Sequence, residues 1–303
     1  MMLDRQNPPI LFIVNPSAGH GKCGKRWNKL APKIEEKYSC EVFYTKRPGE
    51  AEAEARMAVE RGIKRIFVVG GDGTINEVIN GAMSANIEIG IIPFGTGNDL
   101  AKAVGLSKKK HLIEAMVLNQ ETLKVKEINV GKINHRHFVI ACGIGFDGWV
   151  AKRANDSRFL KSLGALGYVF SVFAVLRSFT PMTIEVTIDG TSHKIENGWL
   201  LAVGNGPYYG GGMKICPDAD IHDDWLDLCI VSKLSKWQLF RFFPKVYSGK
   251  HVHLKDYVTF MKGKRMKIQC QGKTVAHADG EFIDSSDLNI VLCEQGIKML
   301  TMP

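Results

Sequence analysis

The sequence predicts two domains: a doubly wound α/β domain at the N-terminus and a β-rich, sandwich-like domain after it. Two apolar runs, residues 66–69 and 89–92, each end in a glycine-containing loop that passes at once into a helical pattern. Repeated strand, loop and helix units predict parallel strands with crossover helices. From residue 124 onward, β patterns separated by turns dominate, which favours a mostly antiparallel domain. We therefore expect a first domain over residues 1–128 and a second over residues 129–295.

Composition sets broad limits on the function. A chain of 303 residues with 45% hydrophobic content can bury a substantial core. Its seven cysteines form no Cys-x-x-Cys motif, which disfavours both zinc and a disulfide framework. The formal net charge of +9 favours an anionic partner: a nucleotide, an acidic lipid surface or a nucleic acid. Reduced cysteines, and a start without an apolar signal segment, predict a cytoplasmic protein.

The chain opens with an apolar strand, residues 10–14, followed by a loop that matches two phosphate-binding patterns incompletely. Residues 19–24 have the glycine spacing of the dinucleotide fingerprint, but the next strand, residues 41–45, does not end in an acidic residue. Residues 19–25 follow the Walker A pattern until Arg26, where a Mg²⁺-binding Ser or Thr is required. Neither pattern has the context that it needs.

A helix rich in Ala and Glu, residues 50–61, leads to the strand at residues 66–69 and to the glycine loop at residues 70–74. Three glycines there let the backbone approach a ligand closely, and the following helix offers free N–H groups to a phosphate. Asp72 lies inside this loop. A carboxylate repels a phosphate unless a cation lies between them, so the loop predicts phosphate together with Mg²⁺.

The second glycine loop, residues 93–99, again follows a short strand and opens a helix, with Asn98 or Asp99 placed as its N-cap. Two such loops lie at the carboxyl edge of a parallel sheet, where open α/β sheets bind their ligands. Two ordinary turns would not need Asp72, Thr96, Asn98 and Asp99 together, so we expect a binding site here.

In the second half, one long helix is expected over residues 157–177, and its apolar part, residues 164–176, is too short to span a bilayer. A further helix is expected over residues 108–118. The expected strands are residues 124–130, 138–141, 182–188, 194–203, 226–231, 265–270 and 287–292.

The two glycine loops, residues 70–77 and 93–99, resemble the nucleotide-binding motifs of the diacylglycerol kinase catalytic domain. The single-chain bacterial lipid kinases are similar in length, sphingosine and ceramide kinases are relatives, and NAD kinases share the first motif. The resemblance implies an NAD kinase/diacylglycerol kinase-like fold with the active cleft between the domains. It also implies that residues 296–303 return to the first domain. ATP and Mg²⁺ are the implied phosphoryl donor and cofactor.

The loop at residues 15–19 resembles the Asn-Pro-x-x-Gly opening of this family. Thr45, after the second strand, matches one of the family's nucleotide contacts. The residues that we expect to bind the nucleotide, directly or through Mg²⁺, are Asn15, Thr45, Gly70, Gly71, Asp72, Gly73, Thr74, Ile75, Asn76, Glu77, Gly95, Thr96, Gly97, Asn98 and Asp99.

Residues 277–281, His-Ala-Asp-Gly-Glu, form a short acidic turn that on its own predicts a hairpin. The family carries Asp-Gly-Glu at this place and takes its catalytic base from it. Phosphoryl transfer to an alcohol needs a carboxylate within hydrogen-bond reach of the hydroxyl. The expected base is Glu281, with Asp279 as second choice, and Asp72 is the third expected catalytic residue.

Residues 217–227 form a turn rich in Asp. The resemblance implies a structural Mg²⁺ held by the Asp223 side chain and by the carbonyls of Asp220 and Trp225, an oxygen set that suits this ion. The alternative is a solvated acidic loop. The chain departs from the family pattern at Asp224, where a Gly is usual, and at Asn129, where an Asp is usual.

Residues 233–245 combine Trp and Phe with Lys and Arg, a pattern that fits either contact with a membrane surface or an amphipathic helix packed on the core. The predicted activity is ATP-dependent phosphorylation of a lipid hydroxyl, with diacylglycerol giving phosphatidic acid. We expect a cytoplasmic enzyme that binds the membrane peripherally and no nucleic acid, and a homodimer stays open. The alternatives are an NAD kinase-like enzyme and a catalytically weakened nucleotide- or membrane-binding module.

Overall fold

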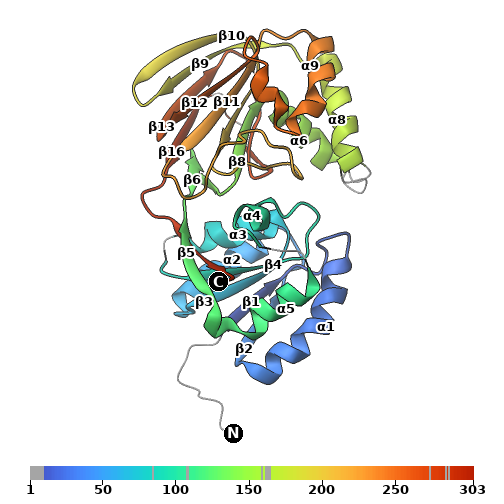
Figure 1. Cartoon of the computed structure of the whole chain (residues 1–303), viewed down its shortest axis with the longest axis vertical. Helices are drawn as coiled ribbons and strands as arrows, with labels where there is room; N and C mark the ends of the chain where they lie inside the picture. Colours follow the sequence, from blue (N-terminus) through green and yellow to red (C-terminus); the bar gives the residue numbers. More distant parts are fainter. Residues whose placement is uncertain are drawn as a thin grey trace. The chain divides into compact units, whose positions relative to one another are not determined.

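The structure, a computed structural model, describes residues 10–83, 85–106, 109–157, 160, 165–272, 274–283, 285 and 287–303 (Figure 1). The chain divides into two compact units. The first comprises the described residues up to Ile128 together with Gln295–Pro303, and the second is Asn129–Glu294.

The first unit is built on a six-stranded sheet with the order β2-β1-β3-β4-β17-β5. Strands β1 to β4 run parallel, β17 joins parallel to β4, and β5 closes the edge antiparallel to β17. The strands are β1 (Ile10–Val14), β2 (Cys40–Tyr44), β3 (Arg65–Gly70), β4 (Glu88–Pro93), β5 (Lys124–Ile128) and β17 (Ile297–Thr301). The continuous apolar runs of β1, β3 and β4 form central strands because helices cover both faces of such a sheet.

The helices of the first unit follow the parallel strands, as crossover units require. They are α1 (Lys22–Lys37), α2 (Glu50–Glu60), α3 (Asp72–Ala82), α4 (Asp99–Ala103) and α5 (Lys110–Leu118), with the 3₁₀ turn η1 (Gln120–Thr122). Helices α2 and α3 pack at Gly81, where a β-carbon would lie 2.3 Å from the carbonyl oxygen of Glu52. The predicted doubly wound α/β domain is confirmed.

The second unit contains an 11-stranded sheet with the order β15-β14-β8-β10-β9-β13-β16-β6-β7, and β11 pairs with β10 and β12. All of its pairings are antiparallel. The strands are β6 (Gly131–Ile133), β7 (Arg136–Phe138), β8 (Ala141–Gly145), β9 (Met182–Ile188), β10 (Thr191–Gly204), β11 (Leu226–Ser232), β12 (Val258–Gly263), β13 (Arg265–Cys270), β14 (Ala276–Ala278), β15 (Glu281–Ile283) and β16 (Asp287–Leu292). Alternation along β13 buries every second side chain, as a one-faced antiparallel sheet predicts. The predicted β-rich second domain is confirmed.

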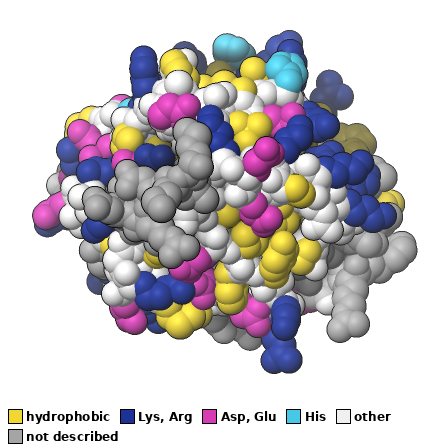
Figure 2. All heavy atoms as spheres, turned by 90° about the horizontal axis from the view of Figure 1, so that it is seen from below, with side chains coloured by type: hydrophobic (Ala, Val, Ile, Leu, Met, Phe, Trp, Pro, Cys, Tyr) yellow, Lys and Arg dark blue, Asp and Glu magenta, His cyan; other side chains and the backbone are white. Residues whose placement is uncertain are grey.

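The helices of the second unit are α6 (Phe146–Asp156), α8 (Ala165–Ser178), α9 (Lys236–Phe242), η2 (Phe243–Val246) and η3 (Lys250–His253). The helix predicted over residues 157–177 corresponds in part to α8, and its residues 158, 159 and 161–164 lie outside the described residues. Among the described helices, none has the length and apolarity to cross a membrane. On the face drawn in Figure 2, basic, acidic and hydrophobic side chains are interspersed.

Candidate active site

Three loops meet at the carboxyl edge of the first unit's sheet, after β1, β3 and β4. The N–H of Gly95 donates to the Gly70 carbonyl at 2.8 Å, which joins the two predicted glycine loops directly. A β-carbon on Gly95 would lie 2.3 Å from the Gly71 α-carbon, so only glycine permits this backbone approach. At Gly19, a β-carbon would lie 2.4 Å from the Phe94 carbonyl oxygen. The structure therefore brings the three loops together.

Asp72 is the first residue of α3 and links the two glycine loops through its carboxylate. Its Oδ1 accepts the N–H of Asp99 at 2.6 Å and that of Leu100 at 3.3 Å, at the start of α4. Burial, and then the charge of Asp99, raise the pKa of Asp72 to about 6. The carboxylate is thus held in a place that disfavours its negative charge, which a cation would stabilise.

Side-chain hydrogen bonds fix the other two loops. Asn15 donates from Nδ2 to Thr74 Oγ1 at 3.0 Å and so connects the first loop to α3. The buried Asn98 has a left-handed φ of 53°, accepts the Gly95 N–H and donates to the Gly95 carbonyl. Thr45 is buried directly after β2, and its N–H donates to the Val14 carbonyl at 2.9 Å. These contacts fix the positions of the loops relative to one another.

Four predicted nucleotide-binding residues have side chains with contacts inside the fold, and their part in nucleotide binding stays a prediction. Ile75 and Asn76 are completely buried on the inner face of α3. Glu77 accepts the N–H of Ala51 at 3.1 Å, near the N-terminus of α2, where a carboxylate stabilises the helix. Asp99 is 4% exposed and accepts a hydrogen bond from the ammonium of the next-turn residue Lys102 at 2.7 Å. The direction of the Ile75, Asn76 and Glu77 side chains follows from their places on α3, which the linear motif does not show.

In the second unit, Asp279 lies in the hairpin turn between β14 and β15. Its carboxylate accepts the N–H groups of Val139, Ile140 and Ala141 at 2.8, 3.1 and 3.0 Å. Its φ of 47° lies in the left-handed region, which Asp tolerates in turns. Both oxygens are therefore engaged in holding the chain before β8. Asp279 thus positions the turn, and its role as the second choice of base stays a prediction.

Glu281, the first choice, begins β15 and is partly open to solvent. Its Oε2 lies 2.8 Å from a guanidinium nitrogen of Arg136, and its side chain is 39% exposed. The guanidinium fixes the carboxylate in place, because charge-assisted pairs of this kind are strongly directional. Glu281 keeps part of its carboxylate open to solvent, and its role as the base stays a prediction.

A buried His–Asp pair, given no role in the sequence analysis, supports the same turn. His277 Nε2 lies 2.7 Å from Asp147 Oδ2, and both side chains are less than 5% exposed. The Gly280 N–H donates to His277 Nδ1 at 3.3 Å, which assigns the ring proton to Nε2 and makes His277 the donor to Asp147. A β-carbon on Gly143 would lie 2.0 Å from Asp147 Oδ2, so the glycine of β8 makes room for the pair. In the sequence, the signal for this pair was the glycine-containing end of β8, followed by Asp147 at the start of α6.

Two family descriptions match the chain, one in each half. The diacylglycerol kinase catalytic domain matches residues 9–133, and the YegS C-terminal NAD kinase beta sandwich-like domain matches residues 140–300. The chain belongs to the diacylglycerol kinase family.

Similar proteins cover nearly the whole length of this family member. It is 31% identical to the "Putative lipid kinase YtlR" of Bacillus subtilis over 96% of this chain and 98% of that protein. It is also 31% identical to a diacylglycerol kinase of Mycobacterium tuberculosis, over 90% of this chain and 88% of that protein. A crystal structure of a Bacillus anthracis protein described as a "putative diacylglycerol kinase" superposes with a TM-score of 0.79 and 25% identity, covering 100% and 99% of the two chains. The resemblance seen in the two glycine loops is confirmed.

The structural Mg²⁺ implied by the resemblance does not fit the residues of this family member. Asp223 Oδ2 accepts a hydrogen bond from the Lys262 ammonium at 3.0 Å, and Asp223 Oδ1 accepts the Trp225 N–H. The Asp220 carbonyl accepts the Asp223 N–H at 3.3 Å. Across the described residues, no group of three His, Cys, Asp or Glu side chains is arranged to hold a metal ion. These contacts disfavour the metal site expected at Asp220, Asp223 and Trp225, which stays a prediction.

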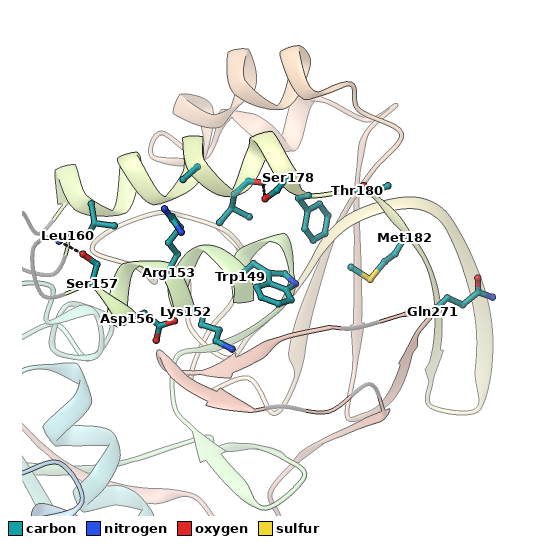
Figure 3. Close-up of a pocket in the computed structure, with 13 residues that line it drawn as sticks. Trp149, Lys152, Arg153, Asp156, Ser157, Leu160, Ser178, Thr180, Met182 and Gln271 are labelled. Carbon is teal, nitrogen blue, oxygen red and sulfur yellow. Dashed lines mark hydrogen bonds between the residues drawn. The ribbon is translucent and has the colours of Figure 1, made fainter.

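Among the cavities lined by the described residues of the second unit of this diacylglycerol kinase family member are a larger and a smaller one. The larger, about 650 Å³, lies between α6 and α8, with Trp149, Lys152 and Arg153 on its α6 side (Figure 3). The smaller, about 70 Å³, is lined mostly by apolar side chains, together with Asp147, Tyr209 and His251.

Proposed function

We propose that this protein transfers the γ-phosphoryl group of ATP to a lipid hydroxyl, with diacylglycerol as acceptor and phosphatidic acid as product. The observation that carries the proposal is the contact between the two glycine loops, closed by the Gly95–Gly70 hydrogen bond and by Asp72. Family membership supports a kinase, and the M. tuberculosis relative is named a diacylglycerol kinase.

The first unit binds the nucleotide in this proposal. Backbone N–H groups of residues 70–74 and the N-terminus of α3 favour the negative charge of phosphate. Burial disfavours the uncompensated negative charge of Asp72, and a bound cation would stabilise that charge. Asp72 would therefore hold the Mg²⁺ that accompanies ATP. The ion would supply neutralisation of phosphate charge.

The second unit supplies the base. The Glu281 carboxylate accepts the proton of the lipid hydroxyl as its oxygen forms a bond to the γ-phosphorus. The bond between the γ-phosphorus and the bridging oxygen breaks, and ADP leaves with that electron pair. Arg136 holds the Glu281 carboxylate, and Asp279 together with the His277–Asp147 pair holds the turn that carries it. Positioning of this kind is the main contribution of a protein to phosphoryl transfer.

An exposed aromatic surface on α8 and α9 gives a route to the lipid. Trp237 is 70% exposed, Phe170 57%, Phe173 45% and Phe240 37%. The Phe240 ring centroid lies 5.1 Å from that of Phe173 and 5.7 Å from that of Trp237. Aromatic side chains exposed together in this way are typical of an interaction surface, and a bilayer interface suits them.

Basic residues lie on the same segment as these rings. Lys236 and Arg241 belong to α9, and the Lys245 ammonium lies 4.9 Å from the centre of the Phe242 ring. Cations beside exposed aromatics favour a membrane that contains anionic lipid. We propose that α8 and α9 bind such a surface, peripherally and during catalysis.

The test is an acceptor screen with γ-labelled ATP. Purified protein is incubated with a total lipid extract, with diacylglycerol in mixed vesicles, and with NAD. Label in a product that migrates with phosphatidic acid is the expected result. Labelled NADP without lipid product would assign the protein to the NAD kinases, and ATP binding without any transfer would make it a binding module.

A further inference from the structure

The acidic turn before β11 gathers five carboxylates within ten residues. They are Asp218, Asp220, Asp223, Asp224 and Asp227. Asp227 is 6% exposed, and a buried carboxylate is unfavourable unless a cation or several donors compensate it. The turn therefore needs positive charge from some source.

Lys262 supplies that charge from the neighbouring strand. The register of β11 and β12 places Lys262 directly opposite Asp227. The Lys262 ammonium lies 3.2 Å from Asp227 Oδ2 and 3.0 Å from Asp223 Oδ2. One ammonium group thus joins the buried carboxylate of the strand to the carboxylate of the turn.

Two further acceptors of the turn have donors within the chain. Asp223 Oδ1 accepts the Trp225 N–H at 3.0 Å, and Asp220 Oδ1 accepts the His222 N–H at 3.0 Å. The Lys264 ammonium lies 5.1 Å from the centre of the Trp225 ring. Mg²⁺ demands near-ideal octahedral oxygen ligands and loses its waters reluctantly. The Lys262 ammonium lies beside Asp223, the only carboxylate of the implied site, and would repel a Mg²⁺ bound there.

We propose that Lys262 is the resident cation of this turn and takes the place of a structural Mg²⁺. The second unit then folds without a divalent ion, and any Mg²⁺ that the protein needs enters with the nucleotide. This inference does not rest on the proposed function, because it concerns stability in the absence of substrates.

The test measures the melting temperature of the full chain without nucleotide, in EDTA and in 10 mM Mg²⁺. Wild type should melt at the same temperature in both. Lys262→Ala should melt roughly 5 °C lower in EDTA, and Mg²⁺ should restore part of the loss because the ion can now occupy the vacated space. Lys267→Gln is the matched control, since that lysine belongs to the same sheet but lies 3.9 Å from an exposed partner, Asp287.

Two outcomes would overturn the proposal. The first is a wild-type melting temperature that rises with Mg²⁺ and loses this response in Asp223→Asn. The second is a Lys262→Ala variant as stable in EDTA as the control. If Lys262→Ala does not fold, metal analysis of nucleotide-free wild type decides: one bound Mg²⁺ per chain contradicts the proposal, and none supports it.

Discussion

Asn129 and Asp224 bind each other through two hydrogen bonds. Asn129 Nδ2 donates to Asp224 Oδ1 at 2.8 Å, and the Asp224 N–H donates to Asn129 Oδ1 at 3.0 Å. Asp224 has a φ of 60°, a conformation that favours glycine, which is the residue usual in the resembled family. The two departures from the family pattern therefore depend on each other. An Asp at position 129 would lack the Nδ2 donor and would place its carboxylate next to that of Asp224. We accordingly do not propose that they abolish catalysis.

This pairing predicts coupled effects on stability. Asn129→Asp alone should lower the free energy of unfolding by about 1 kcal/mol, since it replaces a donor by a like charge. The double variant Asn129→Asp with Asp224→Gly should recover most of the loss, because glycine removes the opposing carboxylate and fits the positive φ. Urea unfolding of the four proteins measures the coupling. Additive losses in the double variant would show that the two residues act independently.

Asp72→Asn should separate function from stability. The amide oxygen can still accept the N–H groups of Asp99 and Leu100, so the loops should keep their shape. Transfer should fall below a tenth of the wild-type rate, a change of more than ~1.4 kcal/mol in the barrier, because the charge that binds Mg²⁺ is gone. Steady-state rates checked against circular dichroism measure both effects. A folded variant that keeps a higher rate would contradict the role given to Asp72.

The same residue makes stability depend on pH. The ordinary pKa of 3.8 rises to about 6 in the folded protein, so the native state holds this proton more tightly than the unfolded chain. The contribution of this proton to the free energy of unfolding is fully present below pH 3.8. It is lost as pH rises through about 6, which lowers the free energy of unfolding by about 3 kcal/mol. The Asp99 carboxylate faces Asp72 and disfavours ionisation further, while Lys102 pairs with Asp99.

Unfolding free energies between pH 4.5 and 7.5 test this dependence. The free energy of unfolding of Asp72→Asn should increase relative to that of wild type as pH rises, because the amide does not ionise. A difference that is constant across the range would show that Asp72 has no raised pKa.

The hairpin turn predicts opposite effects for its two carboxylates. Glu281→Gln should lower the maximal rate at least tenfold with little change in the KM for ATP, because the base contacts the acceptor hydroxyl. Asp279→Ala should lower the melting temperature, because it leaves the N–H groups before β8 without their acceptor. Glu196→Gln, an exposed residue of the same sheet, is the control. Weaker ATP binding with turnover preserved in Glu281→Gln would contradict its role.

The basic and aromatic surface of α8 and α9 predicts dependence on lipid charge. Activity on diacylglycerol should rise with the anionic fraction of the vesicles and fall with salt, since each basic residue near such a surface contributes about 1 kcal/mol that salt screens. Replacing Lys236, Arg241 and Lys245 together by Gln should flatten both dependences. Vesicle sedimentation should show the same trend.

The control for this experiment removes equal charge elsewhere in the second unit. Lys194, Lys255 and Lys267 are exposed and lie outside α8 and α9. Their triple replacement by Gln should leave both dependences close to wild type. Equal effects of the two triple variants would indicate that net charge, and not this surface, governs lipid binding.

Much of the fold follows from local pattern. The strands before both glycine loops were predictable because an apolar β-branched run stops at glycine and a helical pattern begins. Helix α6 was not predicted, since Phe146–Asp156 mixes polar and apolar residues. The two glycine loops were easier to predict than the segments around them, because the close approach of their backbones requires glycine.

The site's supporting contacts depend on tertiary structure. His277 and Asp147 are 130 positions apart, and only the pairing of β14 with β8 brings them together. Lys262 meets Asp227 through strand register. Glu77 has a motif position typical of a ligand contact, yet its side chain caps α2. These roles depend on contacts with a second segment of the chain. A motif within one segment therefore does not reveal them.

The most direct test of the proposed activity is the stoichiometry of transfer by purified wild type. Protein, Mg²⁺, ATP and diacylglycerol in anionic mixed vesicles are incubated together, and ADP and phosphatidic acid are both quantified. The expected result is one phosphatidic acid for each ADP, with both products lost in Asp72→Asn. ADP release without a phosphorylated lipid, or phosphorylation of NAD under the same conditions, would contradict the assignment of a lipid kinase.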